Sequence, residues 1–405
     1  MRSTNWNRLK RHFNLHRFLW LLALVVFVIA WNRGLALLYG LFALILGVLL
    51  LSYIYPWLML RDVRVTRKQA SVGKAGGQLT LEYHIQARRK LFYIELCEHL
   101  PFNITTPRVC SFLPVVAADH RFTVSVHCEV RGAFTLDAVS LESSYPFGVV
   151  SRARTLPTEP ATVLVLPRTF SINHLAYAAY SRHGVDGIIQ SANAGSYHEF
   201  SGLREYRYGD SLKRVHWGAT ARHQELVIKE YDSYDRPTIL VVLDQRAAFD
   251  IGELPETTFE YAVQIAASVI EYAIKNNIGV YVYGRGREAT SFSVMPGAQG
   301  SHEFLERLAR VRSDGSVPYP QVLGESLAEF GDVNTVMTFT HRSAKDTDRI
   351  VGMIDGHITH LDIDMVDQSF ITPLASYQQR QGVRHGNRIT WSVSRLTRLE
   401  ELFRV

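Results

Sequence analysis

One segment of the chain concentrates charged, aromatic and glycine residues directly ahead of a hydrophobic strand. This segment, residues 200–230, is called the signature segment below, and its arginines lie close enough in sequence to its carboxylates to form ion pairs. Asp210 follows Gly209 as a helix cap follows a turn, and the apolar spacing after Asp210 predicts a short amphipathic helix. Arginine and aromatic side chains dominate binding energies at protein interfaces, so the segment is a candidate partner-binding element. Its candidate binding residues are Arg204, Tyr206, Arg207, Gly209, Asp210, Arg214, Trp217 and Arg222.

Two interpretations of the signature segment stay open at this stage. Its ion pairs and Trp217 would fix the junction between two domains if they are buried, or would form a docking surface if they are exposed. One element is able to do both.

The residues of the signature segment also carry a family resemblance. The order Leu203-Arg-Glu-Tyr-Arg-Tyr-Gly-Asp210, then His216-Trp217, Ala221-Arg222, Leu226 and Lys229-Glu230, resembles the signature of the bacterial domain of unknown function 58 family. The resemblance extends to an N-terminal apolar hairpin, to Arg131-Gly-Ala-Phe134 and to Pro146-Phe-Gly148, although Tyr145 stands where the family usually has Asp. It implies a membrane-anchored relative of von Willebrand factor A (vWA) domains with a MoxR-type AAA+ ATPase as its partner. It implies no reaction.

Asp244 is the candidate metal ligand of such a domain. A working vWA metal site needs Asp-x-Ser-x-Ser after the first strand, because a carboxylate and two hydroxyls are hard oxygen ligands for Mg²⁺. This chain has Asp244-Gln-Arg-Ala-Ala248, so both hydroxyls are missing and Arg246 adds a cation. We expect Asp244 to be a structural carboxylate paired with Arg246 or with an arginine of the signature segment. A metal-dependent binding module that uses Asp244 with Asp250 or with ligands remote in the sequence is the alternative.

A third group lies on one predicted strand, where His360, Asp362 and Asp364 share a face. A histidine with two carboxylates is able to bind a divalent ion and would support a metal-assisted hydrolase. Polar residues also alternate with apolar ones on any half-exposed strand, which is the simpler interpretation. The sequence has no P-loop, no dinucleotide fingerprint and no nucleophile elbow, so we expect a protein that is not an enzyme and has no cofactor or small-molecule substrate.

The three cysteines, Cys97, Cys110 and Cys128, form no CxxC motif. We expect them to be reduced and buried. A bridge from Cys97 to Cys110 or to Cys128 would require this region to lie outside the cytoplasm.

Two apolar runs near the N-terminus predict a membrane anchor. The runs cover residues 18–31 and 35–55, and one straight helix over both would be roughly 57 Å long, nearly twice a hydrocarbon core of roughly 30 Å. We therefore expect a hairpin that turns at Asn32-Arg-Gly34 and contacts the bilayer through residues 18–55. A signal peptide or a re-entrant hairpin are the alternatives, because the first run is short.

Basic residues predict the orientation of this hairpin. Arg33 alone occupies the turn, whereas both outer ends are rich in basic residues, so the positive-inside rule places both termini in the cytoplasm of a bacterial inner membrane. The net charge of +6 is modest, and no basic run interleaved with aromatics follows, which disfavours nucleic acid as a partner. The flanking basic residues are Arg2, Arg8, Lys10, Arg11 and Arg17 before the first run, and Arg61, Arg64, Arg67 and Lys68 after the second.

The remaining chain predicts two further folds. Short period-two segments between residues 63 and 166 indicate an antiparallel β-sandwich, and alternating strands and helices after residue 237 indicate a parallel α/β sheet with Asp244 at its carboxyl edge. The expected class is an α+β multidomain protein: residues 1–60 as basic N-terminus and transmembrane hairpin, 61–166 as β-sandwich, 167–236 as connector and signature segment, and 237–405 as a vWA-like, Rossmann-type domain. Its expected function is that of a membrane-anchored adaptor for protein partners.

Overall fold

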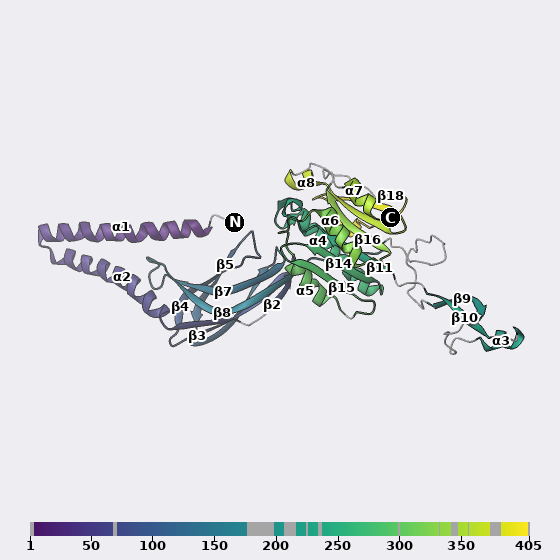
Figure 1. Cartoon of the computed structure of the whole chain (residues 1–405). Coiled ribbons are helices and arrows are strands. Elements are labelled where there is room, and N and C mark those ends of the chain that lie inside the picture. The colour runs from purple at the N-terminus through teal and green to yellow at the C-terminus, as the bar shows by residue number, and fades with distance from the viewer. Residues whose placement is uncertain are drawn as a thin grey trace. The chain divides into compact units, whose positions relative to one another are not determined.

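The computed structural model describes most of the chain, which divides into two compact units. We call Met1–Leu166 the hairpin-sandwich unit and Pro167–Val405 the α/β unit. Figure 1 labels their helices and strands. The described residues are 4–67, 71–175, 198–205, 216–223, 226–233, 237–298, 300–331, 333–341, 347–354, 356–372 and 382–403.

The predicted helical hairpin is present at the N-terminus. Helix α1 (Thr4–Arg33) and helix α2 (Ala36–Leu60) are joined by Gly34 and Leu35, and Figure 1 shows them side by side. Gly34 adopts φ +62°, a left-handed conformation that glycine takes without a Cβ clash, and its N–H donates to the Ala30 carbonyl at 2.8 Å. Phe27 packs on Phe42 across the hairpin with ring centroids 5.0 Å apart. Both helices are long and apolar enough to cross a membrane, over Leu15–Arg33 and Ala36–Leu60.

Helix α2 continues past the point at which the apolar run ends in the sequence. The run stops at Tyr55, but the helix passes through Pro56 and ends at Leu60. Contacts with the sandwich hold this last turn, because Met59 accepts a hydrogen bond from the Phe92 N–H at 3.5 Å and the Arg154 guanidinium donates to the carbonyls of Leu60 and Arg61. An arginine on the final carbonyls of a helix satisfies groups that have no partner within the helix.

Two sheets then form the predicted β-sandwich. One sheet has the order β1-β3-β6 and the other β2-β8-β7-β4-β5, and every pairing is antiparallel except β2 with β8. Alternate residues of both sheets fill one core, for example Leu81 and Ile85 from β3 and Ile94 and Leu96 from β4. The strands are β1 (Val63–Arg67), β2 (Ser71–Lys74), β3 (Gln78–Ala87), β4 (Leu91–His99), β5 (Arg108–Val116), β6 (Asp119–His127), β7 (Gly132–Ser143) and β8 (Arg152–Leu166).

A buried ion pair lies inside this sandwich. Arg67, counted from the sequence among the cations that flank the membrane, instead donates to Glu98 and to the Leu136 carbonyl at 3.0 Å. Tyr83 donates to the second oxygen of Glu98. The side chains of Arg67 and Glu98 are 1% and 2% exposed. Burial is the largest influence on the pKa of Glu98 and raises it, while the hydrogen bonds from Tyr83 and Arg67 oppose that rise. The hydrogen bonds from Arg67 and Tyr83 are therefore what stabilises the charged form of Glu98 in the core.

We predict that Arg67→Met lowers the free energy of unfolding of the full chain in detergent by about 3–5 kcal/mol, because it leaves a buried carboxylate without its cation. Arg67→Met combined with Glu98→Gln should recover a large part of that loss. Chemical denaturation monitored by tryptophan fluorescence measures both. A single variant as stable as the wild type would contradict the buried pair.

The expectation of three reduced cysteines is wrong for two of them. Cys97 and Cys110 form a disulfide between β4 and β5, and their Cα atoms are 4.1 Å apart. The register explains the pairing, because Cys97 lies directly opposite Cys110 in the antiparallel ladder. Cys128 is the buried free thiol that the sequence suggested, and burial raises its pKa to about 11. Strand register between segments 13 residues apart is not readable from a cysteine count.

The α/β unit is built on a seven-stranded sheet with the order β15-β14-β11-β16-β17-β19-β18. Neighbours from β14 to β19 are parallel, and β15 and β18 add antiparallel edges that the sequence did not predict. Numbered in chain order, the seven strands are arranged 3-2-1-4-5-7-6. Without the short edge strand β18 this is the doubly wound order 3-2-1-4-5-6, which reverses between β11 and β16. The strands are β11 (Thr238–Leu243), β14 (Gly279–Arg285), β15 (Ala289–Val294), β16 (Thr335–His341), β17 (Thr359–Met365), β18 (Val383–His385) and β19 (Arg388–Val393).

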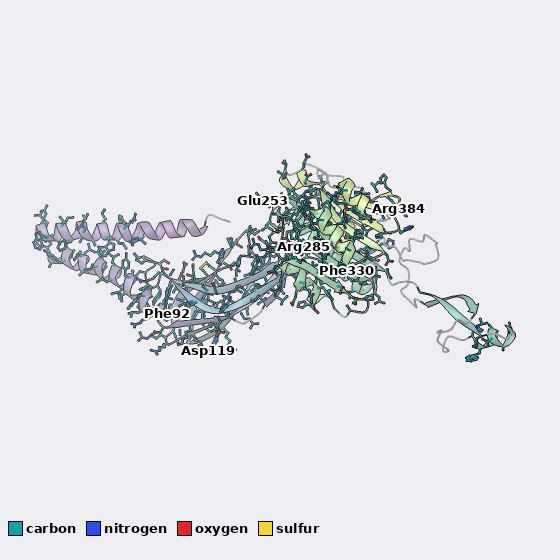
Figure 2. The ribbon with its side chains drawn as sticks, viewed as in Figure 1. Phe92, Asp119, Glu253, Arg285, Phe330 and Arg384 are labelled. Carbon is teal, nitrogen blue, oxygen red and sulfur yellow. A yellow bond between two sulfur atoms is a disulfide. The ribbon has the colours of Figure 1, made fainter. Side chains whose placement is uncertain are left out.

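Helices pack on this sheet through apolar faces. Helix α4 buries Ala262, Ile265, Ala266, Val269 and Ile270, the five residues that its periodicity predicts to point inward, and the Thr257 side chain caps its N-terminus at 3.2 Å from the Glu260 N–H. A second core joins β11, β14 and β16 to helices α6 and α7, and Figure 2 labels Phe330, which ends α6 and stacks on Tyr281. The helices are α4 (Thr258–Lys275), α5 (His302–Arg310), α6 (Tyr319–Glu329), α7 (Thr347–Met353) and α8 (Asp367–Ile371).

Candidate functional site

The carboxyl edge of β11 is where a doubly wound sheet binds ligands, and Asp244 lies there. Arg246 holds both oxygens of this carboxylate. Its Nε lies 2.9 Å and 3.1 Å from them, a terminal nitrogen lies 2.6 Å from Oδ2, and its backbone N–H donates to Oδ1 at 3.1 Å. The Asp244 side chain is 2% exposed. A cation from the chain itself therefore fills the coordination sphere that a metal would need.

The crevice between β11 and β16 is filled as well. The Tyr319 hydroxyl donates to the Val242 carbonyl on β11 at 2.8 Å and accepts from the Phe339 N–H on β16 at 3.1 Å. Tyr319 is 1% exposed, and the Arg246 guanidinium lies 5.9 Å from the centre of its ring. One tyrosine thus joins the two strands where the strand order reverses.

Two loops close over the neighbouring residue, Gln245. Its side-chain amide donates to Thr290 at 2.9 Å, and its backbone carbonyl accepts from the Gly315 N–H at 2.8 Å. A Cβ added at Gly284 or Gly286 would lie 2.6 Å from the Gln245 side chain, and one at Gly315 would lie 2.3 Å from the Arg285 carbonyl. The approach at Gly315 to a backbone carbonyl is possible only without a side chain, whereas a side chain at Gly284 or Gly286 would require Gln245 to shift, so the glycines allow close packing at this edge. Figure 2 labels Arg285 in this region.

We predict that Arg246→Ala lowers the free energy of unfolding by about 2–4 kcal/mol, since it leaves a buried carboxylate without its cation at a site that is partly open to solvent on the arginine side. Asp244→Asn in the same chain should restore most of the loss. The measurement is denaturation of the full chain in detergent at pH 7.5. Equal stability of Arg246→Ala and the wild type would show that the pair is dispensable.

The predicted strand face with His360, Asp362 and Asp364 is more buried than the half-exposed pattern suggested. His360 and Asp362 on β17 are 2% and 0% exposed, whereas Asp364 is partly exposed and accepts from Ser392 at 3.4 Å. Asp362 accepts from Thr340 at 2.9 Å and from Arg388 at 2.6 Å. His360 Nε2 lies 2.7 Å from the Thr338 hydroxyl. The group is a buried, hydrogen-bonded network within the sheet, in which the Nε of Arg388 has no hydrogen-bond partner among the described residues.

Burial controls the protonation of His360. It lowers the pKa of this imidazole to about 4, against the opposing pull of the Asp362 carboxylate and with added repulsion from Arg388. His360 is therefore neutral at physiological pH, with Thr338 as its hydrogen-bond partner.

We predict that this histidine makes the protein less stable in acid. Because its pKa is near 6.5 when unfolded and about 4 when folded, the unfolded chain binds the proton more readily. Its contribution is complete above about pH 6.5 and is lost as the pH falls toward 4, by about 3 kcal/mol in all. Unfolding titrations at pH 7 and pH 4 should show a fall that is about 3 kcal/mol larger in the wild type than in His360→Gln. The same fall in both would remove His360 from the pH dependence.

The signature segment is described in part. Strands β9 (His198–Glu205) and β10 (Val227–Ser233) form an antiparallel pair, with Arg204 opposite Ile228, and helix α3 (Trp217–His223) precedes β10. The described helix starts at Trp217, later than the cap at Asp210 predicts. His216 caps it, since its Nδ1 accepts from the Ala219 N–H at 3.0 Å. The candidates Tyr206, Arg207, Gly209, Asp210 and Arg214, and the connector residues 176–197, lie outside the described residues.

Two candidate residues of α3 are exposed. Trp217 is 67% exposed and Arg222 is also exposed, whereas Ala219, on the other side of the short helix, is 8% exposed. Thr220 ties the helix to β10 by accepting from the Val227 N–H at 3.1 Å, and the Val227 carbonyl accepts from the His216 N–H at 2.8 Å. Helix α3 therefore exposes the indole ring of Trp217, and its hydrogen bonds to β10 hold the helix in place.

Sequence reasoning missed several residues of this region, above all Tyr319 and Arg388. Tyr319 stands between two prolines at the start of a helix, which is a visible signal for a helix N-terminus but not for a bond between two strands. Arg388 carried no signal, because it meets Asp362 only through the pairing of β17 with β19.

Comparisons with known proteins agree with the signature. Residues 202–336 match the family model described as "Protein of unknown function DUF58". The "Uncharacterized protein YeaD" of Bacillus subtilis (strain 168) is 22% identical over 201 residues, which are 49% of this chain and 48% of the relative. The chain thus matches about half the length of that relative.

A solved structure of Pseudomonas fluorescens alkylpurine DNA glycosylase AlkC, bound to DNA containing an abasic site analog, shares 11% identity over 40% of this chain and 48% of its own. Its TM-score is 0.16, so nothing about the fold or the ligand follows from it.

Fold and site together define a protein with two apolar N-terminal helices, a β-sandwich and a doubly wound sheet whose ligand edge is closed by its own side chains. The match of residues 202–336 to the DUF58 family model supports the family resemblance of the signature segment.

Proposed function

We propose that this chain is a membrane-anchored cytoplasmic adaptor whose vWA-like α/β unit recruits a MoxR-type AAA+ ATPase through the signature segment. The exposure of Trp217 on a fixed helix carries the proposal, because a solvent-exposed tryptophan next to an exposed arginine is the composition of a binding hot spot. The choice of partner rests on the family resemblance alone.

The strand order supports a vWA-like unit. A doubly wound sheet of order 3-2-1-4-5-6, flanked at its far edge by the extra antiparallel strand β18 and with β15 antiparallel at the other edge, places the first strand, β11, at the centre. Asp244 then occupies the position of the metal-binding aspartate of such domains. Its pairing with Arg246 favours a unit that recognises proteins without an ion.

The charges around the hairpin support a cytoplasmic location for both termini, whereas the Cys97–Cys110 disulfide is the observation against it, because cytosolic thiols would keep this pair reduced. Because Arg67 is buried in the sandwich core, it does not count among the basic residues that flank α2. Arg61 and Arg64 still follow α2, whereas Arg33 is alone at the turn of the hairpin. The Arg61 guanidinium lies 5.6 Å from the centre of the Trp57 ring, a pairing suited to the interface between lipid and water.

The two alternatives receive less support. A metal-dependent module would need Asp244 free of Arg246, and a hydrolase that uses His360 would need an accessible imidazole instead of one that is 2% exposed. Calorimetric titration of the full chain with Mg²⁺, Mn²⁺ and Ca²⁺ separates them from the adaptor, which predicts no binding heat at the sheet edge.

We predict that Trp217→Ala weakens capture of the purified MoxR-type ATPase at least tenfold, a loss of about 1.4 kcal/mol or more, because the exposed ring is a contact residue. Arg207→Ala combined with Asp210→Ala should weaken capture as well. The full chain in detergent is immobilised and the ATPase is titrated over it.

The matched control is Ile371→Ala, since Ile371 is a large apolar residue of the same unit and is 68% exposed. It should bind as the wild type does. Binding that is equal for Trp217→Ala and wild type would remove α3 from the interface.

A further inference from the structure

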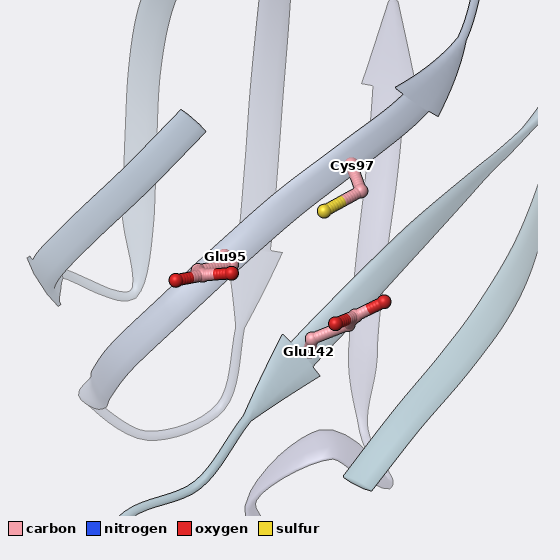
Figure 3. Close-up of side chains that lie close together, drawn as sticks. All are labelled: Glu95, Cys97 and Glu142. Carbon is pink, nitrogen blue, oxygen red and sulfur yellow. The ribbon is translucent and has the colours of Figure 1, made fainter. Parts of the chain in front are cut away.

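Four side chains that suit a metal gather on the face of the sandwich sheet that points away from the core. Ile94 and Leu96 of β4, and Leu141 of β7, point into the core, so the residues between them point outward. These outward residues include Glu95 and Cys97 on β4 and Glu142 on β7, which Figure 3 shows together. Cys110 on β5 is the bonded partner of Cys97.

Register brings these groups into one place. Glu95 lies opposite Glu142 in the pairing of β4 with β7, and Cys97 lies opposite Cys110 in the pairing of β4 with β5. The ligand atoms of Glu95, Cys97 and Glu142 all lie within 4.8 Å of one another. Four ligands around a zinc ion lie about 3.3–3.8 Å apart, which follows from metal–ligand distances of about 2.0–2.3 Å in a tetrahedron. Rotation of these side chains alone would bring the ligand atoms from their present separations to the distances that zinc requires.

Two carboxylates and two sulfur atoms share this face. Two glutamates directly opposite each other on neighbouring strands repel, and both are only partly exposed. Arg108 pairs with Glu142, whose side chain is 16% exposed, so a cation must displace this guanidinium, and the 53% exposed Arg108 side chain is able to move to solvent. Cys97 is 2% exposed, which places the sulfur end of the group in a more sheltered position.

We propose that reduction of the Cys97–Cys110 disulfide creates a binding site for a zinc-type divalent cation, held by the thiolates of Cys97 and Cys110 and the carboxylates of Glu95 and Glu142. Thiolate ligands select zinc over the hard cations Mg²⁺ and Ca²⁺, which prefer oxygen alone. The bonded and metal-bound states exclude each other, because a disulfide sulfur has no thiolate to offer.

The chemistry of the exchange balances with a dithiol as the reductant. The dithiol supplies two electrons, its own sulfurs join in a disulfide, and the bond between Cys97 and Cys110 breaks with one proton taken up by each sulfur. Binding of the cation then releases these two protons to solvent. Cytosolic thiols maintain the reduced state, so the site is available under the cytoplasmic location proposed above.

Cobalt(II) tests the site, because thiolate ligation gives it an intense charge-transfer absorption. The full chain in detergent is reduced with a non-coordinating phosphine without oxygen, the phosphine is removed, and Co²⁺ is titrated. We expect one Co²⁺ per chain with thiolate charge transfer, displacement by Zn²⁺, and loss of the absorption after reoxidation of the pair. Reduced protein with free Cys97 and Cys110 thiols that shows no charge-transfer band would overturn the proposal.

Variants assign the ligands. Cys97→Ser combined with Cys110→Ser should abolish the band, and Cys128→Ser, which alters a buried thiol outside the group, should retain it. Glu95→Gln combined with Glu142→Gln keeps both thiols and alters only partly exposed positions, so it decides the question even if the cysteine variant fails to fold. We expect it to weaken Co²⁺ binding at least tenfold, and unchanged affinity would overturn the four-ligand site. Capture of the ATPase involves the α/β unit and is measured separately, so the two proposals fail independently.

Discussion

A buried carboxylate is stable in a protein only when a cation and hydrogen-bond donors replace its water, and this constraint shapes both units of the chain. Each described core contains carboxylates that are at most 2% exposed, and each of these is held by one arginine and by at least one further hydrogen bond. The arginine comes from another strand in two cases and from two residues away in the third. These pairs are Arg67 with Glu98, Arg388 with Asp362, and Arg246 with Asp244.

The pair at Asp244 decides what the sheet edge is able to do. Arg246 occupies the carboxylate, the Tyr319 hydroxyl joins β11 to β16, and glycine loops close over Gln245. An edge that binds its own side chains has no ligand position to offer in the described part of the chain. Under the proposed adaptor function, recognition would use an element with exposed side chains, and in the α/β unit α3 presents Trp217 in this way. The closed edge and the exposed helix are two parts of one argument for an adaptor.

Local patterns were enough to predict much of this fold. The apolar runs gave the hairpin, period-two alternation gave strands β3, β4 and β6, and helical periodicity gave the inward face of α4. The signature segment gave a family resemblance that the family-model match over residues 202–336 supports. Each of these features repeats or ends within a short window, so the sequence records it directly.

Long-range pairing was not predictable in the same way. In the sequence, Arg67 has the position of a membrane-flanking cation, but in the structure β1 places it in the sandwich beside Glu98. His360 has the sequence pattern of a surface residue, but its strand lies between β16 and β19 in the interior of the sheet. The Cys97–Cys110 bond depends on the register of β4 with β5, and the antiparallel strands β15 and β18 depend on the edges of the finished sheet. In each case the deciding contact joins segments whose register no local pattern specifies.

The most direct measurement of the adaptor account is site-specific photo-crosslinking in native membranes. A photoreactive amino acid replaces Trp217 in one strain and Ile371 in another, so that two exposed apolar positions of one unit are compared. The account predicts a crosslink to the MoxR-type ATPase from position 217 and none from position 371. No crosslink from position 217 while the ATPase is crosslinked from position 371 would contradict it.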